Sequence, residues 1–332
     1  MRDKVYLFGV LMVAGLLLYA GWWLFQANVV APWGLTFAGT TGVGVLGITL
    51  YRVQAELRAS RRELARKDAE ISFAREVQEA LFPRQLPKDS GLEFSATCLP
   101  ARGISGDYYD VLGCPSGRVV FAIADISGKG ISAAILMSNL HAVLRVLVGE
   151  GRSPKETCSL INRHMYEVTQ GSRFATLFYA EWCQAEQRLR FVNAGHTPPL
   201  LFTADGSKTL PAGSPPLGLL PNVEIEVGET ALQTGDLVVA CSDGITEAGV
   251  DAGREFGEAR LAALVAGQLG KPLDAIQAEV LRAVRSWAGP EPEDDMTLML
   301  VRATGGALPA PRSPTLQSSC DGALRQAGKE AV

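Results

Sequence analysis

The chain has 332 residues, enough for one to three domains, and its 31 Lys and Arg against 35 Asp and Glu give a formal net charge of −4. This balance contains no excess of basic residues and argues against a nucleic-acid-binding protein. No charged residue occurs from Val5 to Tyr51. An uncharged stretch of this length is atypical of a wholly soluble protein of this size.

Two apolar stretches lie within this uncharged segment. Residues 5–25 are long and apolar enough to cross about 30 Å of hydrocarbon as a helix. Residues 34–51 contain several glycines and reach about the lower limit for a span. We therefore expect residues 1–51 to form a two-helix transmembrane hairpin.

Basic residues flank both expected spans. Arg2 and Lys4 precede the first, and residues 52–67 carry six Lys or Arg against two Glu. Because basic flanks stay on the cytoplasmic side, we expect a multi-pass protein of the inner (cell) membrane whose remaining residues are cytoplasmic. A cleaved signal peptide at residues 5–25 is the alternative, but no convincing small-x-small cleavage site follows it.

The six cysteines are scattered along the chain without any C-x-x-C pair. This spacing predicts neither a zinc site nor a disulfide framework. It fits a reducing cytosol, in agreement with the expected topology.

Residues 52–81 are polar, lack Pro and Gly, and predict a helix that continues from the membrane until Pro83 and Pro87 end it. Apolar residues at alternating spacings of three and four form a heptad-like seam, which polar residues interrupt, the last being Gln78. We expect residues 52–82 to form a signalling helix or coiled coil that makes a homodimer. A single amphipathic helix packed on its own domain is the alternative. The seam consists of Val53, Leu57, Leu64, Ile71, Ala74 and Leu81.

The pattern is globular over residues 83–303. Runs of branched and aromatic residues predict strands, and amphipathic stretches predict helices. Strands follow strands and helices follow helices, so we expect an α+β domain with antiparallel sheets rather than a parallel βαβ sheet. Residues 304–332 are poor in large apolar residues and are expected to be a disordered tail. The expected strands lie in 92–99, 118–125, 174–182, 188–195 and 236–243, and the expected helices in 130–148, 154–168, 258–269 and 273–288.

Four short acidic motifs end or interrupt apolar runs or lie beside glycines. Asp is a poor strand former, so these positions indicate carboxylates at a sheet edge. Converging carboxylates raise one another's pKa unless a cation neutralises them, and oxygen ligands without Cys or His favour Mg²⁺, Mn²⁺ or Ca²⁺. Two such ions would activate a water for phosphoester hydrolysis. Singly, an Asp-Gly after a strand is more often a turn. The motifs are SGDYYD (105–110), ADISGKG (124–130), SDGITE (242–247) and EDDMT (293–297).

The order of these motifs resembles a known family. Residues ~72–302 are similar to the SpoIIE/RsbU branch of the metal-dependent PPM (protein phosphatase 2C-like) serine/threonine phosphatases. The resemblance implies a four-layer α-β-β-α sandwich with the metals at one end of two antiparallel sheets. Further matching stretches, in the family's order, are AREVQEALFPRQLP, FATLFYAEW, NAGHTPPL, PPLGLL and DDMTLMLVR.

The resemblance also implies roles for individual residues. Asp125 corresponds to the ligand that bridges two Mn²⁺ or Mg²⁺ ions, and the backbone carbonyl of Ile126 to a further contact with one of them. Asp243 and Asp294 correspond to the remaining carboxylates of the catalytic metal core. Asp107 corresponds to an outer carboxylate that holds metal-bound water.

Three further residues are expected around this core. Asp110 belongs to the same region as Asp107, and Asp295 occupies the position of an Asn in eukaryotic relatives. His196 in NAGHTPP matches the family, and either a structural role at its turn or a catalytic one is open. The sequence departs from eukaryotic relatives because Ser127 stands where they have a His, and their phosphate-binding Arg has no counterpart. Lys129 is not part of a P-loop, because the G-x-x-x-x-G-K-S/T pattern is absent.

The resemblance implies a phosphatase for a phosphoprotein, for example a STAS-domain anti-sigma factor antagonist in a partner-switching pathway, and the expected spans make it membrane-anchored. A pseudophosphatase scaffold that binds phosphoproteins at the membrane is the alternative. A nucleotide phosphodiesterase is a third interpretation, but the His-rich site of many such enzymes is missing. The full set of acidic residues favours the phosphatase, since a scaffold has no need of converging carboxylates.

Overall fold

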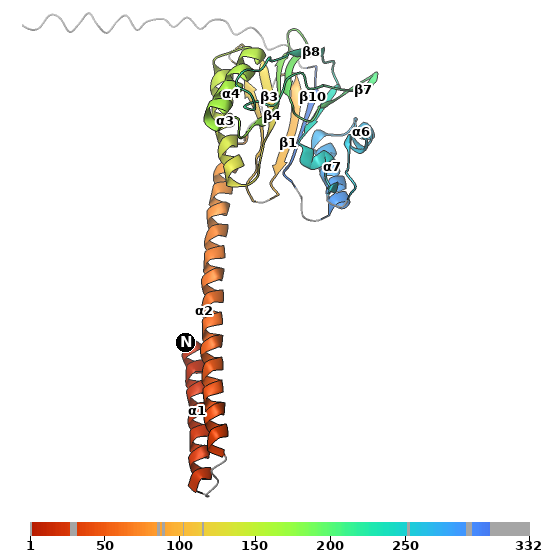
Figure 1. Ribbon diagram of the computed structural model, residues 1–332. Helices are drawn as coiled ribbons and strands as arrows, with labels where there is room; N and C mark the ends of the chain where they lie inside the picture. The colour runs from red at the N-terminus through yellow and green to blue at the C-terminus, as the bar shows by residue number, and fades with distance from the viewer. Residues whose placement is uncertain are drawn as a thin grey trace, which may run out of the picture. The chain divides into compact units, whose positions relative to one another are not determined.

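The computed structural model describes residues 2–26, 32–84, 87, 90–101, 103–114, 116–250, 253–289 and 294–305. The chain divides into a helical unit, Met1–Phe73, and a globular unit, Ala74–Val332 (Figure 1). The expected disordered tail lies outside the described residues from 306 onward, as do Glu293 of the last acidic motif and most of the turn between the two expected spans.

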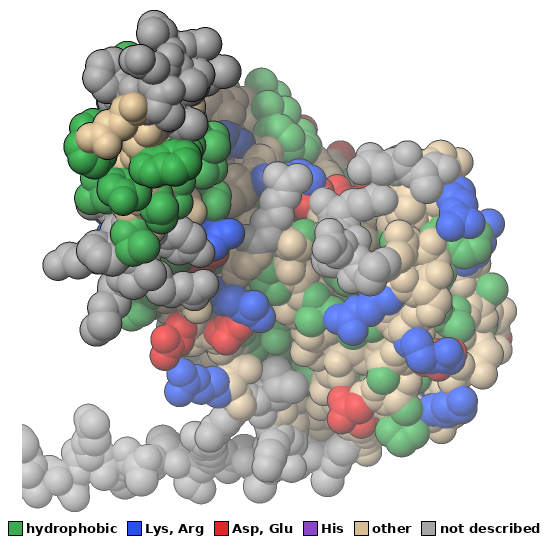
Figure 2. Space-filling view, turned by 90° about the horizontal axis from the view of Figure 1, so that it is seen from below, with side chains coloured by type: hydrophobic (Ala, Val, Ile, Leu, Met, Phe, Trp, Pro, Cys, Tyr) green, Lys and Arg blue, Asp and Glu red, His purple; other side chains and the backbone are tan. Residues whose placement is uncertain are grey.

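The helical unit consists of α1 (Arg2–Gln26) and α2 (Pro32–Glu79), whose last six residues belong to the globular unit. The second expected span and the expected signalling helix are therefore parts of one 48-residue helix, as predicted. Large apolar side chains are exposed on both helices, and Figure 2 shows hydrophobic side chains gathered over this unit. Seven of them are between 59 % and 64 % exposed: Leu11, Leu16, Tyr19, Trp23, Val45, Ile48 and Tyr51.

One helix in the described part of the chain is long and apolar enough to cross a membrane, and it is α3 (Ile131–Gly149) of the globular unit. Met137, Leu140 and Leu144 of α3 are completely buried in the core, so α3 is a core helix. The described part of the first expected span contains a shorter apolar helix, Leu11–Trp23. The expected two-helix transmembrane hairpin therefore stays a prediction.

Two five-stranded sheets form the centre of the globular unit, and every strand pair in them is antiparallel. We call them sheet A and sheet B. Sheet A has the order β1 (Leu92–Leu99), β10 (Met296–Ala303), β9 (Leu237–Cys241), β6 (Leu200–Thr203) and β7 (Gly206–Thr209). Sheet B has the order β2 (Asp107–Gly113), β3 (Val119–Ile126), β4 (Ala175–Cys183), β5 (Arg188–Ala194) and β8 (Gly228–Ala231).

Helices cover the outer faces of both sheets (Figure 1). The helices α3 and α4 (Pro154–Thr169) pack on sheet B, whereas α6 (Glu258–Ala266) and α7 (Leu273–Ala288) pack on sheet A. A third hydrophobic cluster fills the space between the sheets. On α7 the buried residues recur every three or four positions, which turns one face of the helix to the sheet. The expected α+β fold with two antiparallel sheets is confirmed, and its layers are helix, sheet, sheet, helix.

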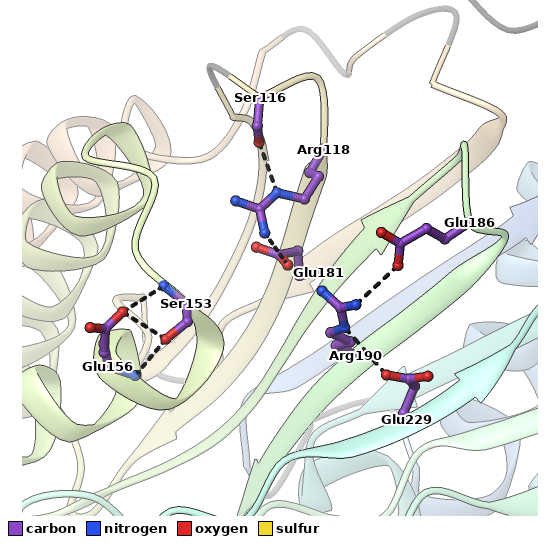
Figure 3. Close-up of polar contacts among 8 residues, drawn as sticks. All are labelled: Ser116, Arg118, Ser153, Glu156, Glu181, Glu186, Arg190 and Glu229. Carbon is purple, nitrogen blue, oxygen red and sulfur yellow. Dashed lines mark hydrogen bonds and ion pairs between the residues drawn. The ribbon is translucent and has the colours of Figure 1, made fainter.

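Polar contacts secure the start of α4 and join neighbouring strands of sheet B (Figure 3). Ser153 and Glu156 form a capping box at the start of α4, in which the Glu156 amide donates to Ser153 Oγ and the Ser153 amide donates to Glu156 Oε2. Arg118 of the turn before β3 forms an ion pair with Glu181 of β4, which is 2 % exposed. These contacts stabilise the start of α4 and the pairing of β3 with β4.

Candidate functional site

Four carboxylates converge at one end of the two sheets. Asp107 begins β2 and is paired in register with Asp125 near the end of β3. Directly opposed side chains of neighbouring strands point to the same face, here the space between the sheets. From sheet A, Asp243 follows β9 as the first residue of the short helix α5 (Asp243–Thr246), and Asp294 lies just before β10. Because β9 and β10 are antiparallel neighbours, these two residues lie at the same end.

Burial and mutual repulsion act on these carboxylates. Burial raises the pKa of Asp107 well above its ordinary value, and the neighbouring charge of Asp125 adds to this effect. Burial, followed by the charges of Asp243 and Asp294, raises the pKa of Asp125 to about 7. Burial and then Asp294 raise the pKa of Asp243. A positive charge among the carboxylates would relieve this repulsion.

Asp107 is held from both sheets. Its side chain is 2 % exposed, and its Oδ2 accepts a hydrogen bond of 2.6 Å from Thr297 Oγ1 of β10. Its amide donates to Ser105 Oγ at 2.9 Å. Thr297 therefore holds the carboxylate that the sequence predicted as an outer ligand, and Ser105 holds the backbone of the same residue.

Asp295 fastens the loop before β2 instead of turning to the other carboxylates. Its Oδ1 accepts from the Ala101 amide, and its Oδ2 accepts from Ser105 Oγ and the Gly106 amide, each at 2.8 Å. Its backbone carbonyl accepts from Ser242 Oγ. The expected place of Asp295 outside the metal ligands stays a prediction.

Two glycines allow the backbone to pass close to these groups. A Cβ on Gly244 would lie 2.1 Å from the Asp295 carbonyl oxygen, a distance that no side chain can occupy. A Cβ on Gly106 would lie 3.2 Å from the Ile126 carbonyl oxygen and 3.7 Å from Asp125 Oδ1. The predicted backbone ligand, Ile126, thus lies beside Gly106 at the same end of the sheets.

The structure does not bring Asp110 to this group. Asp110 lies on the opposite face of β2 and forms an ion pair with Arg145 of α3, with Nε–Oδ2 and Nη2–Oδ1 distances of 2.7 and 3.0 Å. Its Oδ2 also accepts from the Tyr108 hydroxyl. Successive side chains of a strand point to opposite faces, and Asp110 is three residues after Asp107. Asp110 therefore faces the helices that cover sheet B. Its observed contacts join α3 to sheet B.

His196 is 3 % exposed and is held at its turn. Its amide donates to Asn193 Oδ1, and its Nδ1 lies 2.9 Å from Thr176 Oγ1. Burial lowers the pKa of the imidazole to about 4, so the ring is neutral at pH 7. Thr176 is opposite Asp125 in the β3–β4 register. His196 is therefore connected to Asp125 through the side chain of Thr176.

A lysine that the sequence did not assign to the site lies at its edge. Lys129 Nζ is 2.5 Å from Asp294 Oδ2. Ser105, Thr297 and Gln78 are further contributors that were not predicted, because their contacts join segments 27 to 190 residues apart. For Gln78 a signal existed, since it is a polar residue within an apolar helical seam.

The residues present fit an open site for a hard cation. Within the described ranges, no three or more His, Cys, Asp or Glu side chains form a group that could hold a metal ion. The site instead offers separate carboxylates and the Ile126 carbonyl at the ends of strands. Mg²⁺ usually takes only one or two carboxylates and keeps several waters, so such a donor set suits it better than a protein cage would.

Two packed antiparallel sheets between helix layers, with acidic residues at one end of both sheets, define a protein phosphatase 2C-like domain. The family model of stage II sporulation protein E (SpoIIE) matches residues 115–304, which is more than half of the chain. The chain belongs to the SpoIIE family, and the predicted SpoIIE/RsbU-type membership among the PPM phosphatases is confirmed.

Curated relatives agree with this membership. Phosphoserine phosphatase RsbU of Bacillus subtilis is 30% identical over 199 residues, which cover 59% of this chain and 58% of RsbU. Protein IcfG of Synechocystis is 23% identical over 346 residues, which cover 88% of this chain and 54% of IcfG. The chain thus spans about half the length of the curated relatives it matches.

Solved structures share the fold. The RsbU and RsbW domains of a Mycobacterium tuberculosis protein align with a TM-score of 0.58 and 27% identity, covering 65% of this chain and 61% of that one. The PP2C domain of SiaA from Pseudomonas aeruginosa aligns with a TM-score of 0.63 and 18% identity, covering 72% and 98%. The second likeness concerns the fold alone.

Proposed function

We propose that this chain is a metal-dependent protein serine/threonine phosphatase that hydrolyses phosphoserine and phosphothreonine with a two-metal-activated water. The observation that carries the proposal is the convergence of Asp107, Asp125, Asp243 and Asp294 at one end of the two sheets in a SpoIIE-family domain. The raised pKa of Asp125, which neighbouring carboxylates reinforce, supports a cation there.

Each group of the site has a role in this proposal. Asp125 would hold both cations, and Asp243, Asp294 and the Ile126 carbonyl would complete their protein ligands. Asp107, fixed by Thr297 and Ser105, would orient a water at the outer side. When bound, Mn²⁺ or Mg²⁺ would supply charge neutralisation and a water of lowered pKa. Ser127 replaces the acid of eukaryotic relatives, so water would protonate the leaving alkoxide oxygen of the serine or threonine, which departs as the hydroxyl.

The substrate is proposed as a phosphoprotein in a partner-switching pathway, such as a STAS-domain anti-sigma factor antagonist. Support comes from two relatives named phosphoserine phosphatases, RsbU and RsbP of Bacillus subtilis. The RsbU and RsbW domains that occur together in the Mycobacterium tuberculosis protein point in the same direction.

We also propose that α1 and the first part of α2 anchor the chain in the inner membrane, with the phosphatase domain in the cytoplasm. Exposed apolar side chains on both helices support an apolar environment, because soluble surfaces rarely expose contiguous apolar patches. The segment 52–82 is proposed to make a homodimer. Val53, Leu57 and Leu64 of its seam are at least 50 % exposed, as a partner helix would require.

The test uses the full-length chain in detergent, with p-nitrophenyl phosphate as substrate and EDTA, Mg²⁺ or Mn²⁺ added. Turnover that needs the metal and is lost in Asp125→Asn supports the proposal. Asp205→Asn, the same change on an exposed turn, is the matched control and should retain full activity. Absence of turnover with every metal, in protein shown to be folded, would favour a pseudophosphatase scaffold.

A further inference from the structure

Lys129 is presented to the acidic site by the loop between β3 and α3. Gly128 and Gly130 on either side of it have φ angles of 100° and 75°, which side-chain-bearing residues rarely adopt. The loop follows directly on Asp125 and Ile126. Its geometry carries the lysine stem across the end of the sandwich to a residue of the other sheet.

The contact that Lys129 makes there is with a proposed metal ligand. Its Nζ lies 2.5 Å from Asp294 Oδ2, and both side chains are about half exposed, at 49 % and 44 %. The other carboxylate oxygen of Asp294, Oδ1, accepts the Asp295 amide at 2.9 Å. Both oxygens of Asp294 are therefore engaged within the chain.

The ammonium also acts on the other carboxylates. Its charge favours the ionised forms of Asp125 and Asp243, in opposition to the repulsion between the acids. A lysine is suited to this contact, because its ammonium is a compact charge on a flexible side chain. The ammonium can move away from Asp294 without a change in the backbone. An ion pair this exposed is weak, so a divalent cation can replace it.

We propose that Lys129 is a tethered counter-ion that competes with a divalent cation for Asp294. In the cation-free chain its ammonium neutralises Asp294, and cation binding displaces it. Lys129 thereby lowers the affinity of the site for its cation and sets the cation concentration at which the site fills. This inference rests on the proposed metal-dependent function.

The test measures cation binding and needs no turnover. The full-length chain in detergent is stripped with EDTA and titrated with Mn²⁺ by isothermal titration calorimetry. Lys129→Met should lower the dissociation constant about two- to fivefold, the size expected for an exposed ion pair. Lys129→Arg keeps the charge and should retain an affinity within twofold of the wild type. Lys129→Gln repeats the test with a polar side chain if the Met variant melts early.

The matched control is Lys155→Met. Lys155 is exposed on the first turn of α4, beyond the far end of α3, a helix of 19 residues and about 28 Å. This change removes the same charge from the chain and should leave Mn²⁺ affinity unchanged. An affinity gain in Lys155→Met equal to that in Lys129→Met would contradict the proposal, since the effect would then be one of net charge.

The outcomes separate this inference from the proposed function. Tighter Mn²⁺ binding in Lys129→Met than in the wild type supports the competition. Binding that is equal or weaker in the folded Met and Gln variants overturns the inference but leaves the phosphatase proposal standing. A wild-type chain that binds no Mn²⁺ overturns both.

Discussion

Gln78 and Ser105 are joined by two reciprocal hydrogen bonds. The Gln78 Nε2 donates to the Ser105 carbonyl at 2.7 Å, and the Ser105 amide donates to Gln78 Oε1 at 2.8 Å. Ser105 Oγ in turn donates to Asp295 and accepts from the Asp107 amide. The last turn of α2 is therefore connected to the acidic site through one buried loop.

Replacing Gln78 with Ala should destabilise the globular unit and weaken Mn²⁺ binding. Two buried groups of Ser105 would lose their partners, each at about 1–3 kcal/mol. Thermal melting and Mn²⁺ titration of the full-length chain measure both effects. Gln54→Ala, an exposed change on the same helix, is the control. Unchanged melting and affinity in Gln78→Ala would show that the connection has no role in holding the site.

The cation-free chain should become less stable as the pH rises from 6.5 to 8. The folded pKa of Asp125, about 7, lies above its ordinary value of 3.8, so the folded chain binds more protons than the unfolded chain in this window. The stabilisation from protonated Asp125 is lost as the pH passes its folded pKa. His196 acts in the opposite direction at the lower end of this window, because its pKa is lowered from 6.5 to about 4 and only the unfolded chain is protonated there. Its contribution is the smaller one, since the unfolded imidazole is only half protonated at pH 6.5.

Melting temperatures at both pH values, with EDTA or with saturating Mn²⁺, test this dependence. Mn²⁺ should reduce the slope, since a bound cation keeps the carboxylates ionised. The cation-free Asp125→Asn variant should also show a smaller slope. A cation-free wild-type chain that melts higher at pH 8 than at pH 6.5 would contradict the assignment of a raised pKa to Asp125.

Arg118→Met should destabilise the chain more than a change in an exposed ion pair. Glu181 is 2 % exposed, and Arg118 Nη1 lies 2.8 Å from its Oε1. Without Arg118 the buried carboxylate loses its ion-pair partner and keeps only the weaker influence of Arg190, which costs about 2–4 kcal/mol in unfolding free energy. Arg188→Met breaks the exposed pair with Glu229 and should cost at most about 1 kcal/mol. Equal losses in urea unfolding of the two variants would refute this difference.

Gly244→Ala should disrupt the site by a backbone clash. The new Cβ would meet the Asp295 carbonyl at 2.1 Å, and neither backbone can yield without moving Asp243 or Asp294. We expect melting to fall and Mn²⁺ affinity to drop at least tenfold. Gly113→Ala, at the end of β2, meets nothing within 4 Å and should behave as the wild type. Wild-type affinity in Gly244→Ala would show that this close approach is dispensable.

Sequence patterns predicted most of the long amphipathic and apolar elements, but the apolar strand β10 was recognised only as the family stretch DDMTLMLVR. The bounds of α7 agree with the prediction, β5 differs from it by one residue at one end, and β3 and β4 differ from it by one residue at both ends. The short strands β6, β7 and β8 were not predicted. They have four residues each, and β7 and β8 are polar and largely exposed, so no periodic signal marks them. β2 was recognised only as an acidic motif, because two Asp residues and a Gly disguise its strand pattern.

The candidate site was predicted as a set of acids but not as a set of contacts. Asp107, Asp125, Asp243 and Asp294 could be found because their motifs end or interrupt apolar runs or lie beside glycines, and because the order of these motifs resembles the family. The partners that position them could not, since Thr297 reaches Asp107, and Lys129 reaches Asp294, only after the two sheets have packed. Asp110 was expected near the site because β2 was not recognised as a strand. Within the strand, the alternation of side chains places Asp110 on the opposite face from Asp107, where it pairs with Arg145.

Phosphate release from a phosphoserine peptide tests the central claim most directly. The full-length chain in detergent is assayed for inorganic phosphate with Mn²⁺ and with EDTA, alongside Asp125→Asn and Asp205→Asn. We predict Mn²⁺-dependent release by the wild type and by Asp205→Asn, and a rate at least a hundredfold lower in Asp125→Asn. Release that persists in EDTA, or that survives in Asp125→Asn, would contradict a cation-dependent phosphatase site built on these carboxylates.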